Sequence, residues 1–324
     1  MIIKLLRTIL FLSVVALNIS NGKEILGITI SNPANTSVCS AGTATFTATA
    51  SAGTAPYTYQ WYENKGSGFV AITNGTGSSG QVYSNATTAT LTITNVTSPM
   101  NGYTYECTAT NFGGVGSATS TAATLTAYAV LVNGTVSANQ TICYGATPAA
   151  LANVTAPTGG NGAYTYQWQS SPNNSTWTNL GGNSNALTAA TMGALTSTTY
   201  YRRAETSGAG CGTVYSNTIT ITVDAVLAAG TIGGAQTICN NTTPTTLTNV
   251  ASPTGGTGTY TYQWQSAAAI GGPYANATGV STNATYSPAA LVATTYYRRQ
   301  ETSGACGTVN SNICLLYTSP SPRD

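Results

Sequence analysis

The chain has 324 residues, of which 5% are charged and none is histidine, and its formal net charge is +2. A nucleic-acid-binding surface needs clustered Lys and Arg, which nine such residues spread along the chain do not supply. Disorder is excluded as well, because disordered chains combine low hydrophobicity with high net charge, whereas 42% of this chain is hydrophobic. The composition therefore predicts an uncharged β protein.

The first segment, residues 1–22, has the three parts of a secretory signal peptide. Lys4 and Arg7 give a positive start, an apolar stretch covers Ile9 to Leu17, and small or polar residues follow. The apolar stretch is shorter than the about 20 residues that a membrane-spanning helix needs. We therefore expect cleavage near Ser20 to Gly22, no transmembrane segment in the mature chain, and a secreted or cell-surface location. Export also permits disulfide bonds.

Residues 23–127 form the first predicted module, and their pattern is that of strands. The runs TATFTATA at 43–50 and LTITNV at 91–96 alternate with period two and are rich in β-branched residues. Clusters of Gly, Pro, Asn and Ser, such as SAGTAP and GTGSSG, separate the runs and predict turns. No amphipathic segment of helical period exceeds a turn or two. Short alternating strands at this spacing indicate a sandwich of two sheets.

Two further modules, predicted at residues 128–224 and 225–313, are copies of one unit. The run QTICYGATPAALANV around Cys143 returns as QTICNNTTPTTLTNV around Cys239. The motifs PTGG, YTYQWQS and TTYYRR follow in both copies at a constant offset of 96 residues. The first module is a more distant relative that shares the motif YTYQW. The predicted fold is therefore all-β, with three tandem sandwiches.

The last segment, residues 314–324, matches nothing in the repeats. The second module continues after Asn217 as TITITVDAV, whereas the third continues after Asn312 as ICLLYTSPSPRD. This string looks like translated read-through of a sequencing adapter. We therefore expect a non-native tail and a third module that lacks its closing strand, which would leave a sheet edge unpaired. The alternative is a natural tail with a reactive thiol at Cys314.

The first module resembles an immunoglobulin-like domain in the region LTITNVTSPMNGYTYEC. Tyr105 lies two residues before Cys107, where such domains place a tyrosine corner, and Trp61 takes the place of their core tryptophan. In the later modules Tyr200 and Tyr296 end the related pattern L-x-x-T-x-Y. The whole set resembles bacterial immunoglobulin-like repeats of large secreted surface or adhesin proteins, of the kind exported by the type IX route in gliding bacteria.

The resemblance implies buried aromatic residues and one disulfide in each module. Cysteines that lie 67 or 68 residues apart would pair inside the modules. Because the first cysteine of each module precedes the expected strand B, the bond is expected to tie the A/A′ edge to strand F or to the F–G turn. The implied pairs are Cys39–Cys107, Cys143–Cys211 and Cys239–Cys306, and the implied core residues are Trp61, Trp168, Trp264, Tyr105, Tyr200 and Tyr296.

One further aromatic position recurs, as Phe69, Trp177 and Tyr274. Trp177 and Tyr274 are the candidate ligand contacts, with a half-buried structural role as the alternative. The two YYRR motifs end at Arg203 and Arg299, and alternation places the two arginines of each motif on opposite faces of a strand. We expect ion pairs with the nearby glutamates and aliphatic stems that cover the sheet, not a shared anion site.

Catalytic chemistry lacks its usual residues. A Ser or Cys nucleophile needs a base, and the chain has no histidine. A glycosidase needs two carboxylates across a cleft, and a calcium site needs clustered acidic oxygens. Lys65 beside Glu63 is interpreted as a solvated loop pair. We therefore expect no enzymatic activity, no cofactor and no metal site.

The predicted function is that of a non-catalytic extracellular or cell-surface repeat protein, either adhesin-type or a structural spacer. Its partners would be glycans or protein surfaces, with weak contacts that add through repetition. The alternative is a set of accessory modules, carbohydrate-binding or not, on a secreted enzyme whose catalytic domain lies outside this sequence.

Overall fold

The computed structural model describes residues 18–20, 23–25 and 27–319, so the predicted signal peptide lies largely outside the described residues. The chain separates into two compact units. The first consists of Met1–Gly134, Ala156–Thr165 and Glu205–Val214, and the second of Thr135–Thr155, Tyr166–Ala204 and Tyr215–Asp324. Within the described residues, no helix has the length and apolar character that would let it span a membrane.

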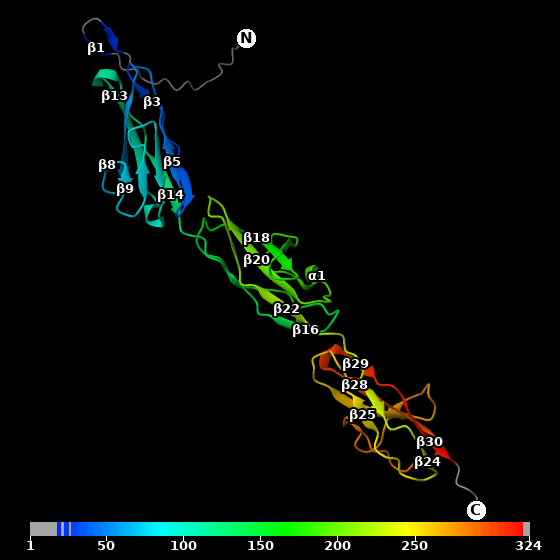
Figure 1. Ribbon diagram of the computed structural model, residues 1–324. Coiled ribbons are helices and arrows are strands. Elements are labelled where there is room, and N and C mark those ends of the chain that lie inside the picture. Colours follow the sequence, from blue (N-terminus) through cyan, green and yellow to red (C-terminus); the bar gives the residue numbers. More distant parts are fainter. Residues whose placement is uncertain (1–17, 21–22, 26, 320–324) are drawn as a thin grey trace, which may run out of the picture. The chain divides into compact units, whose positions relative to one another are not determined.

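The first module is a sandwich of two main sheets (Figure 1). One sheet has the strand order β5-β11-β10-β9, and the other has the order β4-β14-β12-β7-β8, with β13 against β12. The strands β1 and β2 form a separate pair, as do β3 and β6. The bounds are β1 (Asn18–Ser20), β2 (Lys23–Ile25), β3 (Thr29–Ile30), β4 (Thr36–Cys39), β5 (Ala44–Thr47), β6 (Ala50–Ser51), β7 (Thr58–Asn64), β8 (Phe69–Ala71), β9 (Gly75–Thr76), β10 (Val82–Ser84), β11 (Thr90–Thr94), β12 (Thr104–Thr110), β13 (Ser117–Thr119) and β14 (Ala123–Tyr128), with short 3-10 turns at Ser98–Met100 and Phe112–Gly114.

The second and third modules share a main sheet of the same order. It runs β16-β22-β20-β18-β19 in the second module and β24-β30-β28-β26-β27 in the third, with β21 on β20 and β29 on β28. The opposite layer is slighter and consists of the pairs β15-β17 and β23-β25 with isolated bridges. The bounds are β15 (Thr135–Val136), β16 (Gln140–Ile142), β17 (Asn153–Thr155), β18 (Tyr164–Ser171), β19 (Thr178–Asn179), α1 (Ala189–Met192), β20 (Thr199–Ser207), β21 (Thr213–Tyr215), β22 (Ile219–Val223), β23 (Thr231–Gly233), β24 (Gln236–Cys239), β25 (Thr248–Ala251), β26 (Thr261–Ala267), β27 (Ala275–Asn276), β28 (Thr295–Thr302), a 3-10 turn at Gly304–Cys306, β29 (Thr308–Asn310) and β30 (Cys314–Ser319).

The prediction of tandem all-β sandwiches is confirmed, and each core is built around one tryptophan. Trp61, Trp168 and Trp264 are fully buried, at the position where the sequence places them. Each indole N–H donates to a backbone carbonyl, for example Trp61 Nε1 to Thr88 O at 2.9 Å. A buried indole needs such a partner because an unmade hydrogen bond in the interior is costly.

The prediction that Tyr200 and Tyr296 belong to the later cores is wrong, because the buried tyrosine is the next residue in each module. Tyr201 and Tyr297 are buried at 2% and 4% exposure, whereas Tyr200 and Tyr296 are only half-buried. The reason is the period of two along β20 and β28, which sends alternate side chains to opposite faces. Tyr105, which the sequence also places in a core, is fully buried in the first module.

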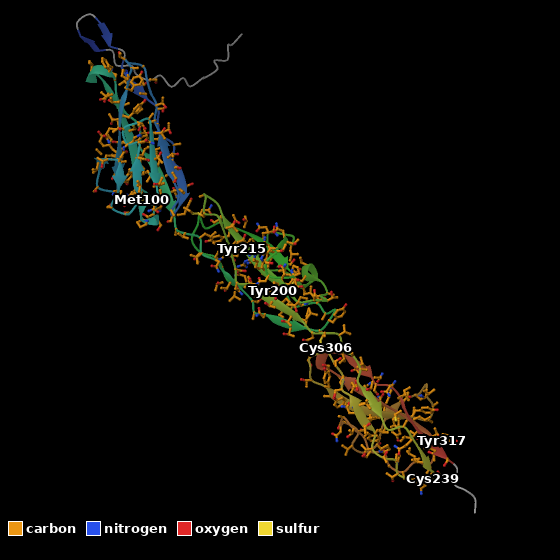
Figure 2. All side chains as sticks on the ribbon, in the orientation of Figure 1. Met100, Tyr200, Tyr215, Cys239, Cys306 and Tyr317 are labelled. Atoms are coloured by element: carbon orange, nitrogen blue, oxygen red, sulfur yellow. A yellow bond between two sulfur atoms is a disulfide. The ribbon has the colours of Figure 1, made fainter. Side chains whose placement is uncertain are left out.

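The third module has a closing strand, contrary to the expectation of an unpaired edge. β30 pairs antiparallel with β28 and parallel with β24. Its alternation buries Cys314 and Leu316, as β22 buries Ile219 and Ile221, while Tyr317 is 48% exposed (Figure 2). The segment can close the sheet because its apolar residues have the period that this edge requires.

Burial of tyrosines makes the folded protein sensitive to alkali. The pKa of Tyr297 is raised from its ordinary 10.0 to about 12. Burial of the side chain is the larger cause, and the nearby Tyr286 is the smaller one. The unfolded chain releases this proton near pH 10 but the folded chain keeps it, so stability is complete below about pH 10 and is lost as the pH rises to about 12. This difference corresponds to about 3 kcal/mol.

We therefore expect the free energy of unfolding of the third module to fall by about 2 kcal/mol between pH 9 and pH 12 because of this residue. Urea denaturation at several pH values, with tyrosinate absorbance as a parallel signal, measures the change. The variant Tyr297→Phe should show a shallower pH dependence over this range. Equal slopes for the two proteins would contradict the assignment.

Candidate functional site

Disulfide bonds join successive modules in this structure. Cys39 at the end of β4 bonds Cys211 in the turn after β20, and Cys143 directly after β16 bonds Cys306 in the turn after β28. The Cα–Cα distances are 5.0 and 5.1 Å, within the usual range for a disulfide. We call each bond, with the two segments that it connects, a staple. The first staple lies wholly in the first compact unit and the second wholly in the second.

The prediction of one disulfide inside each module is therefore wrong. Cys39 lies in register with Tyr128 of β14, whereas the carbonyl of Cys107 accepts a hydrogen bond from Ser120 N. Within this separation β14 alone covers five residue steps, from Ala123 to Tyr128, which is roughly 16 Å of extended chain, so the two sulfurs cannot meet. The A′ edge does bond to an F–G turn, but the turn belongs to the next module. The free cysteines of the described chain are Cys107, Cys239 and Cys314.

Equal sequence spacing had aligned residues that are not equivalent. Cys107 lies opposite Trp61 in the register of β12 and β7, and Arg299 lies opposite Trp264 in the register of β28 and β26. Cys107 therefore corresponds to Arg299 and not to Cys306, which lies beyond the end of the strand. Burial raises the pKa of Cys107 to about 12, so it stays a protonated, unreactive thiol at neutral pH.

Arg299 is a fully buried arginine beside the core tryptophan, not an aliphatic stem that covers the sheet. Its guanidinium makes an ion pair of 2.6 Å with the equally buried Glu301. Nη1 donates to Ala284 O at 2.5 Å, and the second oxygen of Glu301 accepts from Gly230 N at 2.7 Å. Arg203 of the second module is buried in the same way, and Glu205 accepts from Gly134 N at 2.7 Å.

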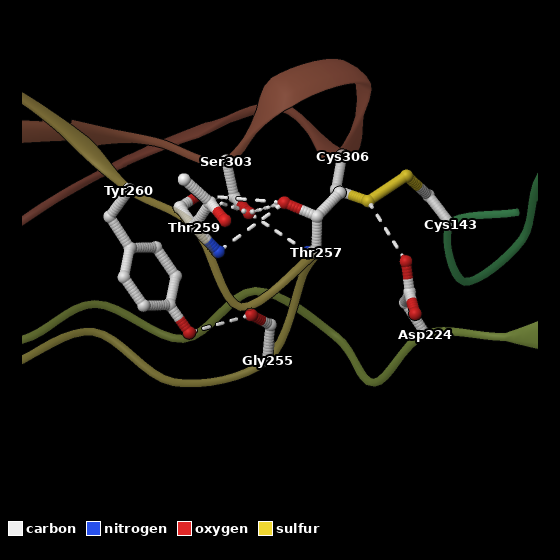
Figure 3. Close-up of a disulfide and its surroundings, with 8 residues drawn as sticks. All are labelled: Cys143, Asp224, Gly255, Thr257, Thr259, Tyr260, Ser303 and Cys306. Carbon is white, nitrogen blue, oxygen red and sulfur yellow. Dashed lines mark hydrogen bonds between the residues drawn. A yellow bond between two sulfur atoms is a disulfide. The ribbon is translucent and has the colours of Figure 1, made fainter. Parts of the chain in front are cut away.

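Hydrogen bonds hold the turn that carries the second staple (Figure 3). The N–H of Cys306 donates to Ser303 O at 2.8 Å, and Ser303 Oγ accepts from Thr257 N at 2.9 Å. The hydroxyl of Tyr260 donates to Gly255 O at 2.8 Å, also visible in Figure 3. The PTGG turn and the F–G turn are thereby locked together, and the cysteine is presented in a fixed position.

The first staple repeats these contacts. The hydroxyl of Tyr164 donates to Gly159 O at 2.8 Å, and Asn161 N donates to Ser207 Oγ at 3.1 Å. Because the same contacts occur in both modules, the F–G turn, the PTGG motif and the cysteine form one recurring structural unit.

Glycine in the PTGG motif is required by the chain that connects two modules. A Cβ at Gly159 would come within 2.0 Å of the carbonyl oxygen of Val130, and a Cβ at Gly255 would come equally close to that of Val226. Both glycines also have positive φ, at 76° and 74°, which disfavours side chains. The connecting segment therefore packs on the turn only because glycine stands there.

Cys143, Asp224 and Cys306 offer ligand atoms within 4.8 Å of one another. A metal is bound by cysteine as the thiolate, and both sulfurs here are consumed by the disulfide. This group is therefore part of the staple and does not make a metal centre.

The two candidate ligand contacts lie on the outer face of the main sheets, each stacked with an arginine. The guanidinium carbon of Arg202 lies 4.1 Å from the ring centre of Trp177 and 3.9 Å from that of Tyr215. Its Nε donates to Gln169 Oε1 at 2.8 Å. Tyr215 is 45% exposed and is labelled in Figure 2. Arginine between two aromatic rings is held in one orientation.

The third module has the same arrangement with one ring fewer. Arg298 lies 4.2 Å from the ring centre of Tyr274, and its Nε donates to Gln265 Oε1 at 2.9 Å. We call these two groups, with their glutamines, the outer arginine clusters. Sequence spacing identified the aromatic residues but not their arginine partners. Arg202 and Arg298 lie on β20 and β28, one strand removed from β19 and β27, which follow Trp177 and Tyr274 in the chain.

Glu63 is one of the residues that line a hollow of about 370 Å³ in the first module. This carboxylate is 7% exposed, which corrects its interpretation as part of a solvated loop pair. It accepts hydrogen bonds from the hydroxyls of Tyr105, at 2.9 Å, and Tyr83, and pairs with Lys65 at 3.1 Å. With both oxygens engaged, Glu63 is a structural anchor of the tyrosine corner and is not a free base.

The fold and the staples define a protein built from tandem immunoglobulin-like sandwiches. The chain belongs to the family described as a domain of unknown function (DUF8696), whose profile matches residues 132–225 and 228–320. A profile described as an immunoglobulin domain matches residues 27–111. No curated protein matches the sequence.

Solved structures of tandem immunoglobulin domains resemble the chain at low identity. A crystal structure of titin domains is 14% identical with a TM-score of 0.33, over 91% of this chain and 98% of that one. Extracellular domains 3–5 of Drosophila OTK are 15% identical with a TM-score of 0.33, over 94% and 100%. The crystal structure of Dpr2 Ig1-Ig2 in complex with DIP-Theta Ig1-Ig3 is 13% identical with a TM-score of 0.36, over 90% of this chain and 100% of that one.

Proposed function

We propose that this protein is a non-catalytic extracellular repeat protein, of the adhesin or structural-spacer type, whose staples couple each module to the next. The observation that carries the proposal is that both disulfides connect the edge of one module to the F–G turn of its successor. Such bonds persist in oxidising compartments, which supports an exported location. Coupled modules suit a role in which many weak contacts act together.

The outer arginine clusters are the proposed contacts with glycans or protein partners. Each combines a half-buried aromatic ring with an oriented guanidinium and an amide side chain, as described above for Arg202 and Arg298. Rings of this kind stack on apolar faces, and the guanidinium nitrogens donate hydrogen bonds to carboxylates or hydroxyls.

Removal of the two rings should abolish recognition if these clusters bind the partner. We expect the full chain with Trp177→Ala and Tyr274→Ala to bind immobilised glycans or cells at least tenfold more weakly than the unaltered chain. Phe112→Ala, which removes a 65% exposed ring elsewhere, is the matched control and should change nothing. Glycan-array binding that survives the double substitution would count against these aromatics as the platform.

The second candidate function is that of accessory, carbohydrate-binding modules on a secreted enzyme. The same outer arginine clusters favour it. The sequence of the full gene distinguishes the two functions. A neighbouring domain rich in His, Asp and Glu would support the enzyme, whereas more repeats and an export-sorting domain would support the adhesin.

We also propose that the protein is bacterial and exported by the type IX route, and that residues 314–324 are translated read-through of a sequencing adapter. The resemblance of the repeats supports the first, and the string CLLYTSPSPRD supports the second. Resequencing of an independent clone across Ile313 and Cys314 tests the second: recovery of CLLYTSPSPRD would refute it.

A further inference from the structure

The third module carries one half of a staple. Cys239 ends β24, is exposed and is free (Figure 2). The two residues in the same place of the preceding modules, Cys39 and Cys143, are both disulfide-bonded. Two equivalent residues of the same chain thus show which group this position binds, namely the thiol of another cysteine.

The backbone around the three cysteines is the same, so Cys239 is presented as its counterparts are. Each cysteine is followed two residues later by a residue with positive φ, whose N–H donates to a carbonyl of the loop before the F strand at 2.7 to 2.8 Å. Each cysteine carbonyl accepts from the third residue after it. The positive-φ residues are Ala41, Gly145 and Asn241, at 68°, 74° and 59°, and the donors to the cysteine carbonyls are Gly42, Ala146 and Thr242 at 2.9, 3.0 and 3.2 Å.

The mate of the staple is always a cysteine in the F–G turn of the following module. It is Cys211 in the sequence SGAGCGT and Cys306 in SGACGT. The corresponding turn of the first module, residues 111–116, reads NFGGVG and has no cysteine. In each staple the edge cysteine of one module therefore bonds the turn cysteine of the following module. Within the described residues, both turn cysteines are already disulfide-bonded.

We propose that Cys239 is the attachment site for the F–G-turn cysteine of a further module of this family placed directly after the third. The bond forms by thiol–disulfide exchange: two thiols give one disulfide, and a small disulfide such as oxidised glutathione is reduced to two thiols. This inference rests on the proposed role of the staples as couplers of neighbouring modules.

The test lengthens the chain by one module. Residues 319–324 of the full chain are replaced by a second copy of residues 224–318, so that the new junction repeats the one after β22. The added copy carries Cys239→Ser, so that the original third module holds the one Cys239 of the protein. The matched control is the same protein with Cys306→Ser in the added copy as well. Both proteins are oxidised with glutathione, alkylated with iodoacetamide and digested without reduction, and the peptides are identified by mass spectrometry.

We expect a peptide in which Cys239 is linked to Cys306 of the added copy, and at least tenfold less alkylation of Cys239 than in the control. A Cys239 that is alkylated equally in both proteins, while the bonds Cys39–Cys211 and Cys143–Cys306 are present, overturns this inference and leaves the proposed function standing. A link between the Cys239 residues of two molecules also overturns it. Absence of the two internal bonds contradicts the proposed function itself.

A second variant covers the case in which the added module prevents folding. Cys143→Ser in the unextended chain releases Cys306, so that its turn can bond Cys239 of another molecule. We expect a Cys239–Cys306 link between molecules after oxidation at high protein concentration. Full alkylation of both thiols with no such link would overturn the proposal.

Discussion

Removal of the Glu301 carboxylate is expected to destabilise the third module by about 3–5 kcal/mol. The side chains of Glu301 and Arg299 are both fully buried and lie 2.6 Å apart. Glu301→Ala would leave the guanidinium charged in the core beside Trp264, since arginine does not lose its proton. It would also remove the acceptor of the Gly230 N–H.

Hydrogen exchange followed by mass spectrometry measures this change in β28 separately from the other modules. Arg298→Ala on the outward face of the same strand is the control, and we expect it to cost less than about 1 kcal/mol. A loss of the same small size for Glu301→Ala would show that the pair does not hold the core together.

Loss of the first staple is the second large effect. The bond between Cys39 and Cys211 closes a segment with a sequence separation of 172 residues. On the chain-entropy estimate, a loop of this length contributes about 5 kcal/mol to the stability of the segment that it closes. The double variant Cys39→Ser with Cys211→Ser should therefore unfold at a lower temperature, with the second module no longer coupled to the first.

Calorimetry of the oxidised proteins measures the transitions, and non-reducing peptide mapping verifies the bonds. Cys239→Ser removes an exposed thiol without breaking a bond, and we expect it to change stability by no more than about 0.5 kcal/mol. If the double variant behaves like this control, the staple has no stabilising role.

The sandwich could be predicted from sequence because its signals are local. Alternation with period two placed the strands, and the repeated YTYQW motif placed one tryptophan in each core. The disulfides could not be predicted in this way, because their partners depend on which edges meet between modules. Equal cysteine spacing favoured pairs within modules, although Cys107 and Cys306 occupy different places in the F strand and its turn.

The buried arginines were missed for a physical reason. Arginine is rarely buried fully, so composition assigned the YYRR motif to the surface. A usable signal was present: Tyr105 precedes Cys107 by two residues, and Tyr297 precedes Arg299 by two. The shared spacing places arginine where the first module has its core cysteine. The outer arginine clusters were only half predictable, because a contact such as that of Arg202 with Trp177 depends on neighbouring strands.

The direction of the staples has a consequence for biogenesis. Arg203 and Arg299 occupy the core position at which the first module has a cysteine, so the two repeated sandwiches close their cores without any oxidant. Oxidation is needed for the two bonds that join one module to the next. Each bond needs the F–G turn of one module to meet the edge of the module before it, so free thiols at Cys211 and Cys306 would mark a chain whose neighbouring modules are not yet joined.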